Sequence, residues 1–400
     1  MALGPQHTGQ VLPLLIIGQI ALHGAMAGQR MAAPLQALQA GHSAWAVGVL
    51  LALFAALPVL TAMAAGRMAD RHGYHRPVHL AIALTMLGAA CAVAACWLPG
   101  WWQFGLNCLG AAASGVGTNV GLIAIQRTAS QLASTGTERL RVFSWLGMAP
   151  SLANVVGPVA AGLMIDAGGF AAAYTLLLLM PVVSILVARL VPTRPGPPRS
   201  VAREPGSSRW DLLSAPGMKR LLFVNWLLSA SWDVHSFAVP VLGHARGYNA
   251  STIGLVLGLF TAAVTLVRFA IPMLAHRLRE VTVLRTAMLL TGAVFAVYPF
   301  AGTPWAMGGC AVLLGLTLGA VQPMIMSTLH HLTPTHRHGE AIAFRSMAIN
   351  FSSSVMPLAF GLAGTALGPG ALFWLMGAAV GGGSWVAVGL RKVFAAGPAG

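Results

Sequence analysis

The chain has 400 residues, of which 57% are hydrophobic and only 8% are charged, and its mean hydropathy is +0.76. Because a soluble domain carries about 25% charged residues, this composition excludes an ordinary soluble protein and predicts an integral membrane protein. The formal net charge of +15 does not indicate nucleic-acid binding, since the basic residues lie between apolar runs and do not form one basic face. We expect no nucleic-acid partner.

Twelve apolar segments of about 20 residues, the length that crosses a bilayer, follow one another along the chain. They lie at approximately 11–37, 44–66, 78–98, 102–131, 141–165, 170–190, 220–243, 251–274, 282–301, 305–330, 343–366 and 371–391. Residues 191–218 are rich in Pro and Arg, which is too polar and too broken for a membrane helix. We therefore predict an all-α integral membrane protein with an N-terminal six-helix bundle at 1–190, a cytoplasmic linker at 191–218 and a C-terminal six-helix bundle at 219–400.

The basic residues are distributed asymmetrically across this topology. If the N-terminus is cytoplasmic, nearly all Lys and Arg residues lie in inner loops or at inner helix ends, and only Arg30 and Arg246 lie in the outer half. Lys and Arg accumulate in cytoplasmic loops, so we expect both termini in the cytoplasm and a location in a bacterial-type inner (plasma) membrane. No Lys or Arg precedes the first apolar run, so we expect the first helix to be retained and not removed as a signal peptide.

The two halves of the chain are related by an internal repeat. A shift of 206 residues aligns Gly41 with Gly247, Gly48 with Gly254, Phe54 with Phe260 and Arg71 with Arg277, and a shift of 199 aligns Pro158 with Pro357 and Gly162 with Gly361. Repeats of this kind are typical of secondary transporters, whose solute site lies near the bilayer midplane where the two halves meet. The repeat therefore predicts two pseudo-symmetric bundles that share a central site.

The loop between the second and third segments is charged and punctuated by glycine. It reads Gly-Arg-Met-Ala-Asp-Arg-His-Gly-Tyr-His-Arg, and it closely resembles the loop between the second and third helices of the major facilitator superfamily. The resemblance extends to the length, the twelve spans and the long middle linker, and it implies the major facilitator fold with alternating access by rocking of two bundles. A predicted gating set combines this loop with two arginines near the inner interface: Gly66, Asp70, Arg71, Gly73, Arg76, Arg127 and Arg345.

The fifth segment is similar to one branch of that superfamily. Gly157 and Pro158 followed by Gly162 resemble the Gly-Pro signature of the drug and proton antiporters. The match is partial, because Ala153 and Ala161 stand where that branch has further glycines. The fourth segment also lacks the arginine that the branch carries in its outer part, so its proton route is not carried over to this chain.

Polar residues form matching stripes on the first and seventh segments. Gln19, His23, Met26 and Arg30 are spaced by four, three and four residues, which places them on one helix face. The shift of 206 aligns them with Asn225, Ser229, Trp232 and Ser236. Polar side chains in a membrane normally face a cavity or a partner. The predicted substrate-binding set is Gln19, His23, Met26, Arg30, Asn119, Gln126, Asn225, Trp232, Ser236, Gln322 and Asn350.

Two charged residues of these stripes have alternative interpretations. Arg30 stays charged in the outer half of a helix, so it either anchors a carboxylate or phosphate of a substrate or extends to the outer interface. Asp233 is the acid nearest the predicted bilayer centre, where carboxyl groups often relay protons. We predict proton coupling at Asp233, against the alternative of a permanent ion pair, and give His235 a secondary role because it could also be a packing residue.

These patterns predict a secondary active transporter that exports an amphipathic compound by alternating access, coupled to protons. A proton-coupled carrier of an organic anion and a non-transporting receptor on the same fold remain alternatives. An enzyme is not expected, because the sequence has no His-Glu-x-x-His, no Gly-x-Ser-x-Gly and no paired carboxylates. The four cysteines have no ligand spacing, so we expect neither metal nor cofactor. The expected partners are the small-molecule substrate, protons and membrane lipid, and we expect a monomer.

Overall fold

The computed structural model describes residues 5–132, 142, 145–192, 211–274, 279–333 and 338–395, and these residues form helices joined by short loops, without strands. Most of the predicted linker at 191–218 lies outside the described residues. The N-terminal half contains α1 (Pro5–Gln39), α2 (Ala44–His72), α3 (His75–Ala95), α4 (Gly100–Leu132) and α6 (Met148–Ala188). The C-terminal half contains α7 (Asp211–Ser214), α8 (Met218–Ala245), α9 (Ala250–Leu274), α10 (Glu280–Val297), η2 (Tyr298–Phe300), α11 (Pro304–Gly319), α12 (Val321–Leu332), α13 (His338–Leu367) and α14 (Pro369–Ala395).

The described helices account for the twelve predicted spans. Ten stretches are long and apolar enough to cross a membrane. One of them has 44 residues, or about 66 Å of helix, and it bends at Gly168 and Gly169 into two spans. The remaining span is α8, which has 28 residues but is less apolar because it carries Lys219, Arg220 and Asp233. The prediction of an all-α membrane protein with twelve helices is therefore confirmed.

The tenth span is interrupted where α11 gives way to α12. Pro323 lies in the first turn of α12 and has no N–H to donate to the carbonyl of Gly319, four residues earlier. The helix therefore breaks at Ala320, and this break lies beside the cavity described below.

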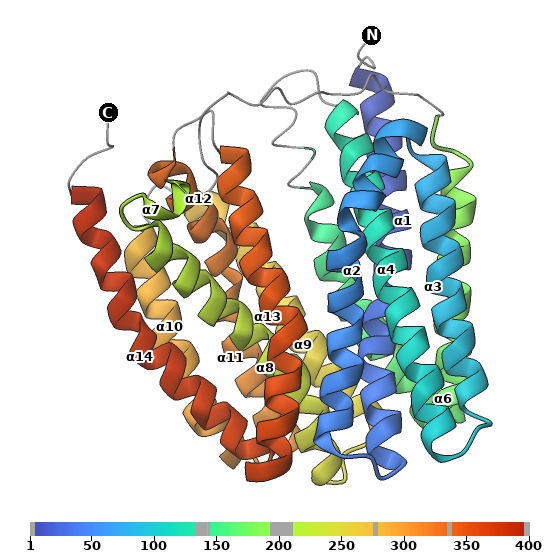
Figure 1. Cartoon of the computed structure of the whole chain (residues 1–400). Helices are drawn as coiled ribbons and strands as arrows, with labels where there is room; N and C mark the ends of the chain where they lie inside the picture. The colour runs from blue at the N-terminus through green and yellow to red at the C-terminus, as the bar shows by residue number, and fades with distance from the viewer. Residues whose placement is uncertain are drawn as a thin grey trace.

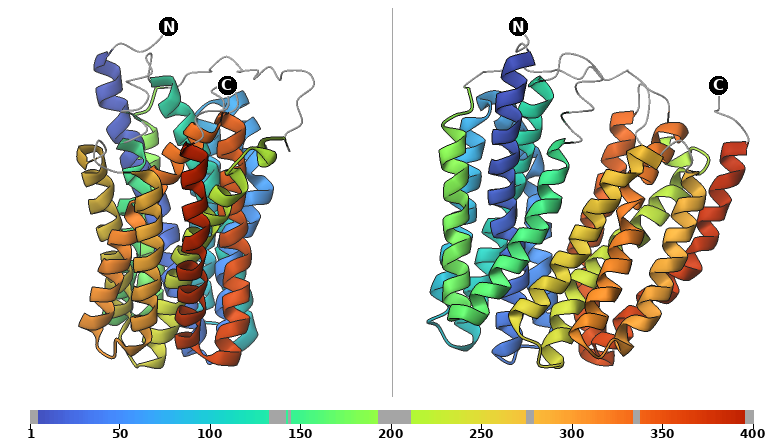
Figure 2. Two further views of the ribbon diagram at one scale, coloured as in Figure 1. Left: turned by 90° about the vertical axis from the view of Figure 1, so that its left-hand side faces the viewer. Right: turned by 180° about the vertical axis from the view of Figure 1, so that it is seen from behind.

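The two halves stand side by side and share one orientation (Figure 1). The start of α1 and the end of α14 lie at the same end of the molecule, which we call the termini end. The loops after α1 and α8 lie at the opposite end, which we call the far end. The halves converge at the far end and diverge toward the termini end, and the views in Figure 2 show the same arrangement from the side and from behind.

Large apolar side chains cover the outer surface of the bundle. Leu60 and Met63 on α2 are 79% and 75% exposed, as expected for side chains that face lipid and not water. Trp101, Trp102 and Trp305 lie at the far end and are also exposed. Tryptophan is enriched where a membrane meets water, so these residues mark one membrane interface.

Two helix pairs join the halves at the far end, and the repeat relates one pair to the other. A Cβ on Gly48 of α2 would lie 2.4 Å from the carbonyl oxygen of Pro357 on α13, and a Cβ on Gly254 of α9 would lie 2.3 Å from that of Pro158 on α6. Only glycine allows backbones to approach this closely. The aligned glycines and prolines of the sequence therefore make equivalent contacts between the halves.

Candidate functional site

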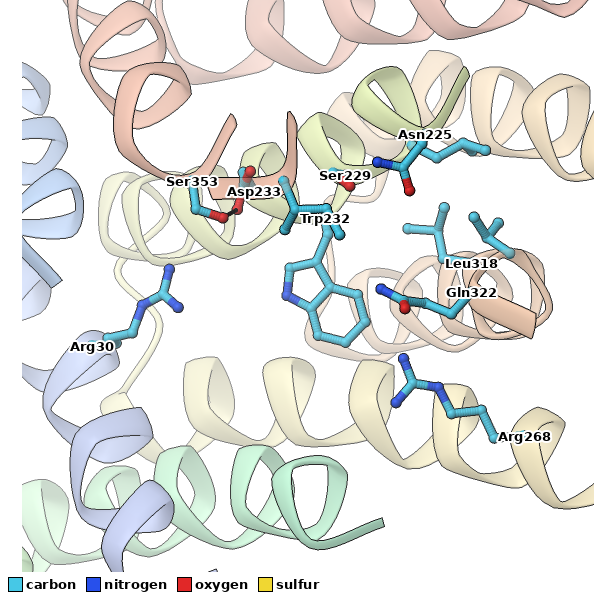
Figure 3. A pocket seen from close by; sticks show the side chains of 12 residues that line it. Arg30, Asn225, Ser229, Trp232, Asp233, Arg268, Leu318, Gln322 and Ser353 are labelled. Carbon is cyan, nitrogen blue, oxygen red and sulfur yellow. Dashed lines mark hydrogen bonds between the residues drawn. The ribbon is translucent and has the colours of Figure 1, made fainter. Parts of the chain in front are cut away.

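A cavity of about 210 Å³ lies between the two halves, close to the middle of α8 (Figure 3). Its walls come from α1, α8, α9, α11, α12 and α13. The lining residues are Arg30, Asn225, Leu228, Ser229, Trp232, Asp233, Arg268, Leu318, Val321, Gln322, Ile349 and Ser353. A smaller cavity of about 50 Å³ adjoins it and shares Arg30 and Trp232. The indole of Trp232 thus lies between the two spaces.

Helix α8 contributes most of the polar wall because of its residue spacing. Asn225, Ser229, Trp232 and Ser236 follow one another at intervals of four, three and four residues, so they lie on one face of the helix. The first three line the larger cavity and Ser236 lines the smaller one. The Nδ2 atom of Asn225 is buried without a hydrogen-bond partner. It is therefore a free donor in the cavity wall.

Asp233 is held by two hydroxyl groups from α13. Ser352 Oγ donates to one carboxylate oxygen at 2.7 Å, and Ser353 Oγ donates to the other at 3.2 Å. The guanidinium of Arg30 points toward this group from the opposite half (Figure 3). Among the described residues, no basic nitrogen lies within 4.0 Å of the carboxylate. Asp233 is therefore fixed in position without a direct ion pair.

Arginines from three helices surround the cavity. Arg30 has no hydrogen-bond partner among the described residues, and it lines both spaces. Arg268 Nη1 donates to Ser151 Oγ of the other half at 2.9 Å, while its buried Nε is unpartnered. Arg345 donates to the side-chain oxygen of Gln322, which lines the wall. The site therefore carries more positive than negative charge.

The structure brings some of the predicted substrate-binding residues together. Arg30, Asn225, Trp232, Ser236 and Gln322 line the two cavities, as does the predicted proton-coupling residue Asp233. These residues come from both halves, in line with a shared site at the interface.

The remaining predicted residues do not line either cavity. Gln19 is fully buried with both amide atoms unpartnered, and Met26 packs with Leu50 and Phe54. The Nδ2 atom of Asn154 lies 3.4 Å from Nε2 of His23. Asn119 donates to the Pro58 carbonyl inside the N-terminal half. Gln126 and Asn350 are exposed.

His235 faces the interior of the C-terminal half. Its imidazole is fully buried, with Nε2 at 3.2 Å from the hydroxyl of Tyr298. Its ring centroid lies 4.4 Å from that of Phe260. These contacts lie within the C-terminal half, whereas the neighbouring Asp233 lines the cavity.

The predicted gating residues of the N-terminal half lie at the termini end. Asp70 accepts a hydrogen bond from Arg127 Nε at 2.9 Å, which joins α2 to α4 within the N-terminal half. Gly73 has a φ of +69°, which explains why the turn into α3 requires glycine. A Cβ at Gly66 would meet no atom within 4 Å. The exposed Arg71 and Arg76 flank the same turn. Arg345 lies in the C-terminal half, where it donates to Gln322 of the cavity wall.

Sequence reasoning missed several residues that build this site. Arg268 was not in the predicted site, but it lines the cavity. Ser352 and Ser353 were not in the predicted site, although three consecutive serines at 352–354 inside an apolar helix indicate hydrogen bonding within the bundle.

The family of the chain follows from a comparison with protein-family models. The model described as Major Facilitator Superfamily matches residues 15–220 and again residues 221–396. The chain belongs to the major facilitator superfamily. It is therefore a multi-pass membrane transporter, as the loop from Gly66 to Arg76 predicted.

The individual relatives of this chain share 25% or less of its sequence. It is 25% identical over 329 residues to the class B tetracycline resistance protein of Escherichia coli, covering 78% of this chain and 77% of that protein. It also superposes on a peptide transporter of the POT type in complex with sulfate, with a TM-score of 0.74, 14% identity and coverage of 96% and 94%. A bacterial homologue of the iron transporter ferroportin in an inward-facing state gives a TM-score of 0.74, 15% identity and coverage of 96% and 99%. These two structures support the fold alone.

Proposed function

We propose that this transporter exports a small amphipathic organic compound across the inner membrane in exchange for protons. The observation that carries the proposal is Asp233, a carboxylate in the central cavity that is fixed by Ser352 and Ser353 and faces Arg30. A carboxyl group inside a membrane protein is costly and commonly serves a proton or ion pathway. Because Asp233 lines the solute cavity, a proton and the solute compete for its carboxylate. This competition would couple proton movement to solute movement.

Alternating access supplies the movement in this proposal. The halves touch at the far end through α2 with α13 and α6 with α9, and they diverge at the termini end (Figure 1). With both termini in the cytoplasm, as the basic residues favour, this arrangement faces inward. Rocking of the halves about the central cavity then exposes Asp233 and the solute to the opposite side.

Export is the proposed direction for two reasons. The tetracycline resistance protein is a relative over most of the chain, and the partial Gly-Pro signature at Gly157 and Pro158 resembles that of drug and proton antiporters. The apolar body of the solute would contact Trp232, Leu228 and Ile349 in the cavity wall.

Proteoliposomes with an internal pH dye and an imposed pH gradient test the coupling. Pools of amphipathic drugs and of organic acids are added to the wild type, to Asp233→Asn and to Glu280→Gln. The last variant is a matched control, because Glu280 bonds Ser327 away from the cavity. We expect solute-dependent proton movement in the wild type and the control, and its loss in Asp233→Asn. Equal proton movement in all three proteins would contradict the assignment of Asp233.

A further inference from the structure

The cavity presents hydrogen-bond donors in excess of acceptors. Arg30 projects from α1 and Arg268 from α9, on either side of the Trp232 indole (Figure 3). The unpartnered Nδ2 of Asn225 and Nε of Arg268 add buried donors. Buried donors without partners cost roughly 1–3 kcal/mol each, and more when they are charged. Arg30 and Arg268 also line one space together, so the cavity favours a ligand that supplies acceptors.

The carboxylates whose side chains the structure describes balance only part of the charge of these arginines. Asp70 pairs with Arg127, and Asp166 accepts from the backbone N–H groups of Ala250 and Ser251 at the far end. Glu280 bonds Ser327. Among the carboxylates whose side chains the structure describes, Asp233 is the one that lines the cavity, and its oxygens already accept from two serines.

We propose that the transported solute is an organic anion that binds between Arg30 and Arg268, one from each half. Guanidinium groups bind carboxylate, phosphate and sulfonate through parallel charge-assisted hydrogen bonds. A solute held between the two arginines also links the two halves across their interface. This inference rests on the proposed transport function and assigns its substrate class.

The shape of the cavity indicates the rest of the solute. Drug-sized ligands occupy pockets of roughly 300–1,000 Å³, so a cavity of about 210 Å³ suits a smaller compound. Trp232 offers a flat aromatic face, and Leu228, Leu318 and Ile349 offer aliphatic contacts. The geometry therefore fits a small aromatic or cyclic body that carries one anionic group, with Arg268 on one side of Trp232 and Arg30 on the other.

Binding to the purified full-length protein in detergent tests this substrate class. The probes are benzoate, 1-naphthoate and 1-naphthalenesulfonate, each measured against its neutral amide by scintillation proximity. We expect at least one anion to bind, and its amide to bind about tenfold or more weakly, because the amide cannot form the charge-assisted bonds. Binding of the amides as tight as that of the anions, or no binding by any anion, would overturn the proposal.

Substitution of Arg30 and Arg268 tests whether the anion binds in this cavity. In Arg268→Gln and in Arg30→Gln we expect the dissociation constant of the anion to rise about tenfold to a hundredfold. Arg268→Lys keeps the charge and should recover part of the affinity. Arg220→Gln is the matched control, because Arg220 lies outside the cavity and donates to the Gly389 carbonyl. Unchanged anion binding in Arg268→Gln would contradict the inferred role of Arg268.

The two proposals fail in different ways. Proton movement with neutral amphipathic compounds, without binding of any anion, would remove the substrate class and leave proton-coupled transport standing. Anion binding that depends on Arg268, without proton movement by any compound, would keep the substrate class and remove the coupling.

Discussion

Helices α1 and α8 carry equivalent polar stripes in the sequence, but the structure uses them differently. On α8, all four stripe residues line the two cavities. On α1, only Arg30 does so, while Gln19 and Met26 are buried inside the N-terminal half. The halves are nonetheless alike where they touch, since Gly48 and Gly254 make matching backbone contacts. The repeat is thus retained in the contacts between the halves and has diverged in the solute site.

This difference has a physical reason. Close backbone approach at the far end depends on residue size, and any side chain larger than glycine would collide with the opposite helix. The cavity depends on which helix face points inward, and that orientation is set by packing within each half. Helix α1 packs along α6, where Gly28 meets Leu177 and Gly24 meets Met180. The polar stripe of α1 is therefore turned partly away from the interface.

We expect the largest effect on far-end closure from replacing Gly48 and Gly254 with larger residues. In Gly48→Leu and Gly254→Leu, the new side chain would meet a carbonyl oxygen at 2.4 Å and 2.3 Å. Overpacking of this kind costs on the order of 1–3 kcal/mol or more, so both variants should disfavour far-end closure. The measurement is the distance between spin labels at positions 102 and 305, which should increase in both variants, together with the transport rate, which should fall.

Gly309→Leu controls for the added bulk, because a Cβ at Gly309 would meet no atom within 4 Å. It should retain the wild-type distance. A response to Gly254→Leu without one to Gly48→Leu would show that the two contacts are not equivalent.

A smaller effect should distinguish the two helix caps at the far end. Asp166 on α6 accepts from the N–H groups of Ala250 and Ser251, while Thr365 on α13, which a shift of 199 residues aligns with it, accepts from the N–H of Trp45. We expect Asp166→Ala to weaken far-end closure by about 1–2 kcal/mol and Thr365→Ala by about 0.5–1 kcal/mol. The same pair of spin labels measures both. A larger shift for Thr365→Ala would contradict the greater strength of the charged cap.

The last comparison separates the two stripes themselves. Gln19 and Asn225 occupy aligned positions, and Gln19 is buried with both amide atoms unpartnered. Gln19→Leu should leave transport unchanged and raise the free energy of unfolding by about 1–3 kcal/mol, because an unsatisfied polar group is removed. Asn225→Leu should lower solute affinity. Thermal unfolding and solute binding of both variants test this. Loss of binding in Gln19→Leu would contradict the inference that Gln19 lies outside the solute site.

Much of the fold could be predicted from sequence because the membrane restricts the choices. Buried backbone groups in lipid must be paired internally, so an apolar segment of about 20 residues implies a helix. Even α8 was recognised, although Asp233 and two basic residues reduce its hydropathy. The residues Gly48, Gly254, Pro158 and Pro357 were aligned by the repeat and make the contacts described above.

The candidate site was only partly predictable, because helix rotation is a tertiary property. The spacing on α1 showed that Gln19, His23, Met26 and Arg30 share a side of the helix, but not which side faces the other half. Arg268 lies near one end of α9, and only the packed structure shows that its long side chain reaches the cavity wall. On α13 the prediction selected Asn350, which is exposed, whereas Ile349 and Ser353 line the cavity.

The central claim is that Asp233 couples proton movement to the solute cavity. The most direct measurement compares pH-driven solute transport with solute exchange at equal pH, in proteoliposomes containing the wild type or Asp233→Asn. We predict that the variant loses pH-driven transport and keeps exchange, because the cavity and the rocking of the halves remain. pH-driven transport of equal size in the variant and the wild type would contradict the account.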